Sequence, residues 1–222
     1  QRVNISKEIG YPVYNELHDL PKPAEAYGIA GWSKDGDRVV LYDRYDMWVI
    51  DLTGEKTIYS LTDGYGRTTN RQFRWLKDDY GDKIIDFENG FLMTSVNLEN
   101  RDEGIYRFQA NGKLKKLMEG PYSVTVNQKS VDQKYCIFTR QSYTEFRDLW
   151  WSDLAFTRPV KITNTNPQQK NYLWGSVKLV EWTNFEGKRN RGLLYLPDGY
   201  DSSKRYPVIV NFYETHTETL HD

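Results

Sequence analysis

Two histidines and one glutamate lie close together near the end of the sequence, at His216, Glu218 and His221. Imidazole and carboxylate groups are the usual zinc ligands, and metalloproteases present them as His-Glu-x-x-His on one helix. The spacing here is different, and neither a helical pattern nor another ligand accompanies it. We therefore expect no metal ion and no cofactor in this chain.

Ser33 and Cys136 are two further side chains to consider as nucleophiles. A hydrolase serine of the elbow type needs the string Gly-x-Ser-x-Gly, which does not occur in these 222 residues. Ser33 has Gly31 before it, but Asp35 stands where the second glycine is required, and Asp35 and Gly36 predict a tight turn. Cys136 is the only cysteine, and its apolar neighbours favour a buried, unreactive thiol.

The composition excludes several classes of protein. The formal net charge is −1, with 30 Lys and Arg against 31 Asp and Glu, so nucleic acid is not an expected partner. No run approaches the roughly 18 apolar residues of a membrane-spanning helix. Seven Trp and seventeen Tyr, together with many Val, Ile and Thr, predict a folded chain that is mostly β.

A strand motif recurs along the chain. Residues 46–52 and 148–154 match at four places, with an aspartate two residues before a tryptophan in each. A weaker copy occupies residues 103–108, where Tyr106 takes the place of the tryptophan. A repeat of roughly 50 residues with several strands in each copy is typical of β-propeller blades.

Each copy of the motif is followed by a turn and then by another short strand, at 58–62, 114–118 and 159–163. This order predicts the third strand, the hairpin and the outer fourth strand of a blade. We therefore expect residues 1–175 to form a partial β-propeller of about three blade equivalents. Since about four to eight blades close a ring, the others would lie upstream of Gln1. A β-sandwich with coincidental tryptophan spacing is the alternative.

The last part of the sequence changes character. It contains Glu-Gly-Lys at 186–188, Gly-Leu-Leu-Tyr-Leu-Pro-Asp-Gly-Tyr at 192–200 and Tyr-Pro-Val-Ile-Val at 206–210. These strings resemble the start of the catalytic domain in the prolyl oligopeptidase family of serine peptidases, in particular its dipeptidyl-peptidase-like members. The resemblance implies that residues 176–222 are the first strands of an α/β-hydrolase domain. Residues 207–213 are expected to be a strand that is apolar on both faces.

The resemblance also implies an activity. The family cleaves short peptides through an activated serine and an acyl-enzyme, and its propeller limits access to the catalytic cavity. Tyr213 matches the tyrosine that donates its hydroxyl to the oxyanion in dipeptidyl-peptidase-like members. The nucleophile, the acid and the histidine would all lie beyond Asp222, so this chain alone is expected to be inactive.

Other features of the family are harder to assign. After Tyr213 many members have a small turn with Gly-Pro, whereas this chain has Glu-Thr-His, as in a bacterial subgroup. That likeness leans toward a protein of the bacterial periplasm or cell surface. The family's paired glutamates, which hold the substrate's amino terminus, have no clear counterpart. Candidates by charge are Glu25, Glu99, Glu103 and Glu145, and ordinary solvated carboxylates are the simpler interpretation for each.

Two other functions stay open on the sequence alone. The blades could form a non-catalytic binding or scaffold module with interaction loops on one face. The parent could also be an acyl-peptide hydrolase or esterase, because one fold supports several substrates. An open array of blades also exposes an unpaired sheet edge, so we expect the chain to self-associate or to be partly disordered at its ends.

Overall fold

The computed structural model describes residues 3–54, 57–78, 81–212 and 217–221. Among these residues the strands form three four-stranded antiparallel sheets and one two-stranded sheet, and none of the four is closed. The mostly β fold class expected from the composition is confirmed, and the arrangement fits a partial β-propeller. Contacts divide the chain into two units, 1–99 with 103–119 and 100–102 with 120–222.

The first sheet, named blade 1, consists of β1 (Ile29–Trp32), β2 (Arg38–Tyr42), β3 (Met47–Asp51) and β4 (Ile58–Ser60) in sequential order. The turn from β1 to β2 contains Asp35 and Gly36, and Gly36 has a φ of 82°, which a glycine adopts at little cost. The repeated motif therefore does form the third strand, and the segment after its turn forms the fourth.

The second sheet, blade 2, repeats this order with β5 (Arg71–Trp75), β6 (Phe91–Asn97), β7 (Glu103–Phe108) and β8 (Leu114–Gly120). A short helix, α1 (Tyr65–Thr68), connects β4 to β5. Tyr106 lies in the third strand, as the weaker copy of the motif predicts. Gly104 stands where the other two copies have aspartate, and a Cβ there would come within 2.6 Å of the Met118 carbonyl oxygen.

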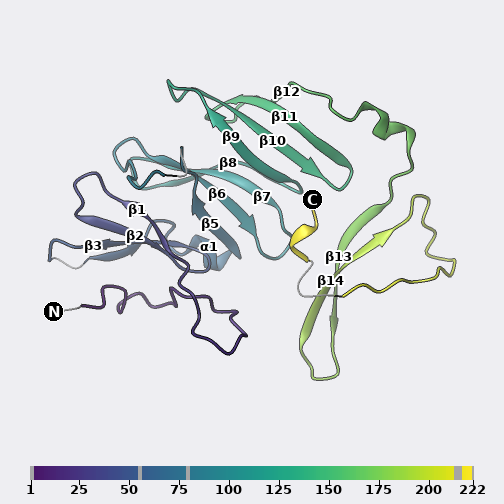
Figure 1. The fold of residues 1–222 in the computed structure, drawn as a ribbon, viewed down its shortest axis with the longest axis horizontal. Coiled ribbons are helices and arrows are strands. Elements are labelled where there is room, and N and C mark those ends of the chain that lie inside the picture. Colours follow the sequence, from purple (N-terminus) through teal and green to yellow (C-terminus); the bar gives the residue numbers. More distant parts are fainter. Residues whose placement is uncertain (1–2, 55–56, 79–80, 213–216, 222) are drawn as a thin grey trace. The chain divides into compact units, whose positions relative to one another are not determined.

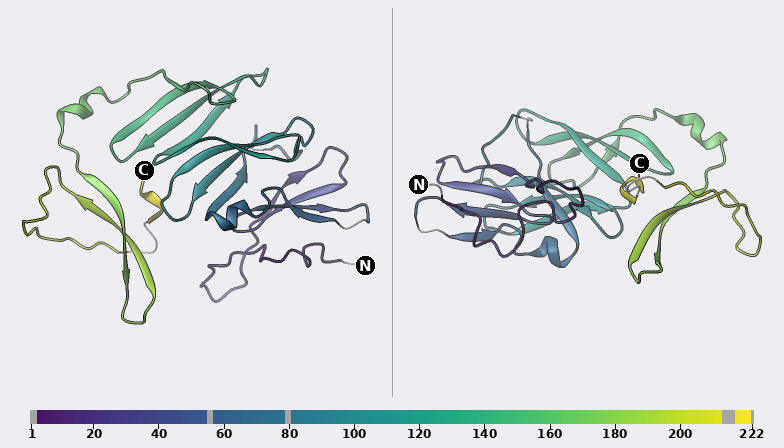
Figure 2. Two further views of the ribbon diagram at one scale, coloured as in Figure 1. Left: turned by 180° about the vertical axis from the view of Figure 1, so that it is seen from behind. Right: turned by 60° about the horizontal axis from the view of Figure 1, so that its bottom comes forward.

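Blades 1 and 2 share one apolar core and lie side by side in the views of Figures 1 and 2. Blade 1 contributes Val40, Met47, Val49 and Leu61 among others, and blade 2 contributes Phe73, Ile85, Met93, Tyr106 and Phe108. Backbone hydrogen bonds also cross between the sheets, from Trp32 N–H to the Lys83 carbonyl and from Phe73 N–H to the Tyr45 carbonyl. Each blade thus covers a face that the other cannot bury alone.

The other face of blade 1 is covered by the segment that precedes it. Ile9 is buried against Val39 and Ile50, and Val13 packs beside them. Arg67 of α1 lies over the ring of Tyr11, with its guanidinium carbon 3.9 Å from the ring centroid. The N-terminal segment is therefore part of the folded unit.

In the second unit, blade 3 consists of β9 (Ser123–Lys129), β10 (Tyr135–Ser142), β11 (Glu145–Asp153) and β12 (Val160–Lys161). One face buries Cys136 and Phe138, with Phe156 5.5 Å from the Phe138 ring. Tyr135 and Trp151 stack on the opposite, exposed face. The third copy of the motif again forms the third strand.

The other described residues of the second unit form one hairpin and two short 3-10 helices. The hairpin pairs β13 (Ser176–Thr183) with β14 (Arg189–Leu196) over their whole length. The helices are η1 (Pro167–Asn171) and η2 (Thr217–Thr219). In the part of the chain that the structure describes, no helix is long and apolar enough to cross a membrane.

Candidate functional site

The hairpin β13–β14 carries the sequence strings that resemble a peptidase catalytic domain. Its turn is held by Asn184, whose side-chain oxygen accepts hydrogen bonds from the amides of Glu186 and Lys188 at 3.0 and 2.9 Å. Gly187 in this turn has a φ of 77°, which favours glycine. Glu181 of β13 pairs with Arg191 of β14 at 2.9 Å. The two strands expected first in this region are therefore formed.

The third expected strand of this region is not formed. Residues 207–212 have no regular secondary structure, and Val208, Ile209 and Phe212 are between 77% and 96% exposed. A strand that is apolar on both faces requires neighbouring strands and covering layers. After β12 the only strands among the described residues are those of the two-stranded hairpin, and they do not supply the neighbours that such a strand requires.

Tyr213, the candidate oxyanion donor, lies outside the described residues. The structure therefore neither supports nor contradicts its role, and the assignment remains a prediction. His216 lies outside them as well.

The other two metal candidates, Glu218 and His221, are near η2. Glu218 is 3.9 Å from Arg101, and His221 is 3.5 Å from Asp102. Within the described residues no group of three or more His, Cys, Asp or Glu side chains is arranged to hold a metal ion.

The four glutamates considered for amino-terminus binding are spread over different elements. Glu25 accepts a hydrogen bond from Lys22 at 2.8 Å, and Glu145 of β11 accepts one from Arg140 at 2.9 Å. Glu99 follows β6, and Glu103 is the first residue of β7. The pairing of Glu25 and Glu145 with basic neighbours is what ordinary structural carboxylates show.

The two nucleophile candidates have structural surroundings. Ser33 is 2% exposed, and its hydroxyl donates to Asp35 and accepts from the Arg38 amide at 2.9 Å. It therefore fastens the β1–β2 turn, as its sequence context indicates. Cys136 is also 2% exposed, and burial raises the pKa of its thiol to about 11. A thiol that stays protonated at neutral pH is a poor nucleophile.

Buried charge gathers instead at the start of β3, which the sequence analysis did not single out. Asp43 is fully buried and accepts hydrogen bonds from Trp48 Nε1 at 3.1 Å and from Arg67 at 3.2 Å. Arg67 also approaches Glu16 at 3.6 Å.

Asp46 accepts hydrogen bonds from the Thr62 hydroxyl and from the amides of Gly66 and Arg67. The available signal was the spacing of Asp43 and Asp46, three residues apart before a strand.

The electrostatics of this cluster follow from its burial. Removal from water raises the pKa of Asp46, the Thr62 hydrogen bond partly offsets this, and the nearby negative charge of Asp43 raises it again. Each aspartate oxygen that accepts a hydrogen bond receives it from a turn residue, an indole or an arginine of the same unit. The cluster therefore connects the N-terminal segment, β3 and α1, which is a structural role.

A second buried pair holds blade 2 together. Arg71 of β5 makes two hydrogen bonds to Glu119 of β8, at 2.8 and 2.7 Å. The Tyr106 hydroxyl donates to the same carboxylate at 2.7 Å. The hydrogen bond from Arg71 lowers the pKa of Glu119, so this carboxylate stays charged at neutral pH.

Comparison with known proteins gives a fold but no family. No protein-family model matches the sequence, and no curated protein matches it. A candidate dipeptidyl aminopeptidase IV from Bacteroides ovatus superposes with a TM-score of 0.57 at 13% identity. The match covers 81% of this chain and 27% of that one, so this chain spans about a quarter of the other's length.

Two further solved structures match less well. The apo AtxE2 isopeptidase has a TM-score of 0.42 at 13% identity, covering 85% of this chain and 48% of its own. A TolB-like protein from Agrobacterium tumefaciens has a TM-score of 0.28 at 14% identity, covering 76% and 81%. Neither score supports an argument on fold. The Bacteroides structure supports a shared fold alone.

Proposed function

We propose that this chain is part of a serine peptidase of the prolyl oligopeptidase family. In this proposal its blades belong to the propeller, and residues 176–222 begin the α/β-hydrolase domain. The observation that carries it is the succession of three sequential four-stranded sheets and a hairpin bearing the Gly-Leu-Leu-Tyr-Leu-Pro string. The shared fold with the Bacteroides ovatus protein supports the same assignment.

The proposed division of labour follows from these parts. The propeller would admit short peptides to the catalytic cavity and keep folded chains out. The serine, its acid and its histidine would come from sequence outside these 222 residues, because the chain contains no Gly-x-Ser-x-Gly string. The chain by itself would then be inactive.

Tyr213 is the residue of this chain that we propose contacts the reacting atoms. Its hydroxyl would donate a hydrogen bond to the oxyanion of the tetrahedral intermediate, where a preorganised donor is most effective. Residues 207–212 would become a strand once the hydrolase sheet supplies neighbours on both sides. Their exposed apolar side chains support this view, because such a surface is normally covered.

The test compares this chain with the longer protein that contains it. Both are treated with a serine-directed fluorophosphonate probe and with chromogenic dipeptide and acyl-amino-acid substrates. We expect the longer protein to be labelled and active, and this chain to be neither. An unlabelled, inactive longer protein would overturn the proposal and favour a binding module.

A variant pair then tests Tyr213 itself. In the longer protein, Tyr213→Phe is expected to lower kcat by about 10²–10³-fold with little change in KM, as for loss of one oxyanion donor. Tyr195→Phe is the matched control, because Tyr195 lies on β14 and is 54% exposed. Equal kcat values for the two variants would remove Tyr213 from the mechanism.

A further inference from the structure

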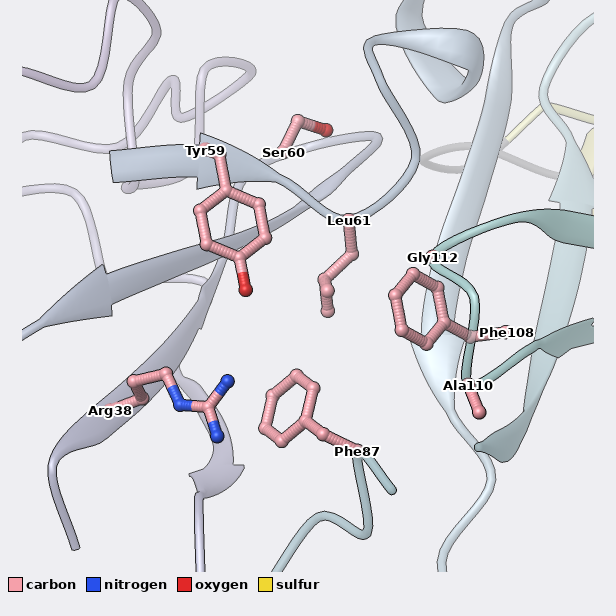
Figure 3. Close-up of a pocket in the computed structure, with 8 residues that line it drawn as sticks. All are labelled: Arg38, Tyr59, Ser60, Leu61, Phe87, Phe108, Ala110 and Gly112. Atoms are coloured by element: carbon pink, nitrogen blue, oxygen red, sulfur yellow. The ribbon is translucent and has the colours of Figure 1, made fainter. Parts of the chain in front are cut away.

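A cavity of about 410 Å³ lies between blades 1 and 2, inside the first unit. Its volume is in the range of small-molecule sites, roughly 300–1,000 Å³. The residues that line it are Arg38, Tyr59, Ser60, Leu61, Phe87, Phe108, Ala110 and Gly112 (Figure 3). None of them belongs to the features on which the proposed peptidase function depends.

The floor of the cavity is apolar and held in place by ring contacts. Leu61 is 4% exposed and Phe108 is 7% exposed. Phe91 stacks on Phe108 with ring centroids 5.2 Å apart and meets Phe87 edge-on at 6.0 Å. The aromatic wall is therefore formed before any ligand arrives, which lowers the entropic cost of binding.

One cation faces this wall. Arg38 is the first residue of β2, and its backbone is fixed by hydrogen bonds with Ser33 in both directions. Its guanidinium carbon lies 4.6 Å from the centroid of the Phe87 ring. In Figure 3 the guanidinium and the Tyr59 hydroxyl point into the same space. Among the described residues, Arg38 has no salt-bridge partner.

Besides the hydrogen bonds of their own turns, the charge of Arg38 lowers the pKa of two carboxylates, those of Asp35 and Asp51, but Arg38 forms a salt bridge with neither. Asp35 accepts hydrogen bonds from the Ser33 hydroxyl and from the Asp37 amide at 3.0 Å. Asp51 accepts them from the amide and the hydroxyl of Thr53 at 2.7 and 2.5 Å. Both carboxylates thus close their own turns, and the guanidinium donors of Arg38 remain available to a ligand in the cavity.

We propose that this cavity binds a small organic carboxylate that carries an aromatic or branched apolar group. Arg38 would hold the carboxylate through its paired N–H donors, which match carboxylate geometry. The Tyr59 hydroxyl would add another donor at the rim. The apolar group would pack against Leu61 and Phe108. Charge complementarity and the apolar floor together define this ligand class.

The test is a titration of this chain with N-acetyl-L-phenylalanine, its primary amide and acetate, followed by isothermal calorimetry or NMR. We expect the acid to bind about tenfold more tightly than the amide, which lacks the charge, and than acetate, which lacks the ring. Equal affinity for the acid and the amide, or for the acid and acetate, would overturn the proposal.

Three variants locate the site. Arg38→Gln is expected to remove the preference for acid over amide, whereas the exposed Arg158→Gln is expected to keep it. Ala110→Trp leaves Arg38 intact and fills the cavity, so it is expected to abolish binding of the acid. Circular dichroism checks that each variant is folded. Unchanged affinity in Ala110→Trp would mean that the acid binds elsewhere.

Discussion

Blades 1 and 3 contain the same Asp-x-Trp motif but surround it with opposite charge. In blade 3, Asp148 accepts hydrogen bonds from the Thr163 hydroxyl and the Thr165 amide, and Lys161 lies 2.6 Å away. In blade 1, Asp46 has a matching hydroxyl from Thr62, but its close charged neighbour is Asp43. The two blades therefore share the hydroxyl hydrogen bond to the aspartate but differ in the charged group beside it.

The consequence is a pair of opposite pKa shifts. Burial raises the pKa of both aspartates, and in blade 1 this effect wins for Asp46. In blade 3 the hydrogen bonds from Lys161, Thr163 and Thr165 outweigh burial, so the pKa of Asp148 lies far below its usual range. In blade 3 the added hydrogen bonds, one of them from a cation, stabilise the carboxylate as an anion in spite of its burial.

Blades 1 and 3 also differ at the residue three places before the aspartate. Asp43 of blade 1 is fully buried and binds the indole N–H of Trp48. Its counterpart Glu145 in blade 3 pairs with Arg140, which lies over the ring of Trp150 at 3.9 Å. The indole N–H of Trp150 has no hydrogen-bond partner among the described residues. Blade 3 therefore uses a cation–π contact where blade 1 uses a hydrogen bond.

Among the variants that test this comparison, Asp148→Ala is expected to have the largest effect on the free energy of unfolding. The change leaves Lys161, Thr163 and the Thr165 amide without their shared acceptor, so we expect a loss of about 3–5 kcal/mol in the free energy of unfolding. Urea unfolding followed by tryptophan fluorescence measures it. Asp132→Ala is the control in the same blade, because Asp132 is exposed and its pairing with Lys134 contributes little to stability. A loss below that of the control would contradict the importance of the buried acceptor.

A smaller effect is expected from Lys161→Met, which removes the cation beside Asp148. Lys161 is 37% exposed, so its loss is expected to cost about 1–2 kcal/mol, less than a fully buried charged hydrogen bond. The pKa of Asp148, measured by NMR titration, is expected to rise. An unchanged pKa would show that the threonine hydrogen bonds alone stabilise the anion. Lys134→Met on the exposed turn serves as the control.

Blade 2 has Gly104 in place of the aspartate, and Tyr106→Phe tests its own buried carboxylate, Glu119. The variant removes one hydrogen bond to Glu119 while both bonds from Arg71 remain. We expect a loss of about 0.5–1.5 kcal/mol in the free energy of unfolding. The exposed Tyr135→Phe is expected to change it little. A loss far above this range would mean that the hydroxyl also supports the packing of Phe73, which meets Tyr106 edge-on at 5.0 Å.

The smallest expected effect is the one that Asp46 and Asp148 have on the pH dependence of the free energy of unfolding. Because the folded pKa of Asp46 is raised above 3.8, the native state binds more protons than the unfolded state in the window above that value. The contribution of Asp46 to the free energy of unfolding is thus lost as pH rises through the pKa that Asp46 has in the folded state. For Asp148 the pKa is lowered, so its stability is present above 3.8 and lost as pH falls below it.

The matched variants Asp46→Asn and Asp148→Asn separate these slopes. Relative to Asp46→Asn, the wild-type chain is expected to lose stability as pH rises from about 4 toward 7. Relative to Asp148→Asn, it is expected to lose stability as pH falls below about 4. Unfolding curves at a series of pH values provide both comparisons. Slopes of the same sign would be evidence against the charge difference between the blades.

The strand order of all three blades could be predicted because its signals are local. Turn residues such as Gly36 and the alternating apolar strands act within a few positions of each other. The buried cluster could not be predicted in this way, since Glu16, Asp43 and Arg67 are far apart in the sequence and meet only after folding. Cavity-lining Arg38 was missed for the same reason.

In the C-terminal part, local sequence signals predict the hairpin but not a strand that depends on neighbouring strands. The hairpin of β13 and β14 forms as its sequence predicts, because its register is fixed by the turn at Asn184 and Gly187. The strand expected at 207–213 depends on neighbours that these residues do not supply, and residues 207–212 are not a strand here. Tyr213 remains a prediction from family resemblance.

The shared core of blades 1 and 2 also has a consequence for synthesis. Met47 and Val49 of β3 are covered by side chains as late in the chain as Phe108. At roughly 5–20 residues per second, a ribosome needs several seconds to add the intervening segment. During that time blade 1 has one bare apolar face, which is a natural target for a chaperone. We therefore expect blade 1 of the nascent chain to be exposed to aggregation until Phe108 has been added.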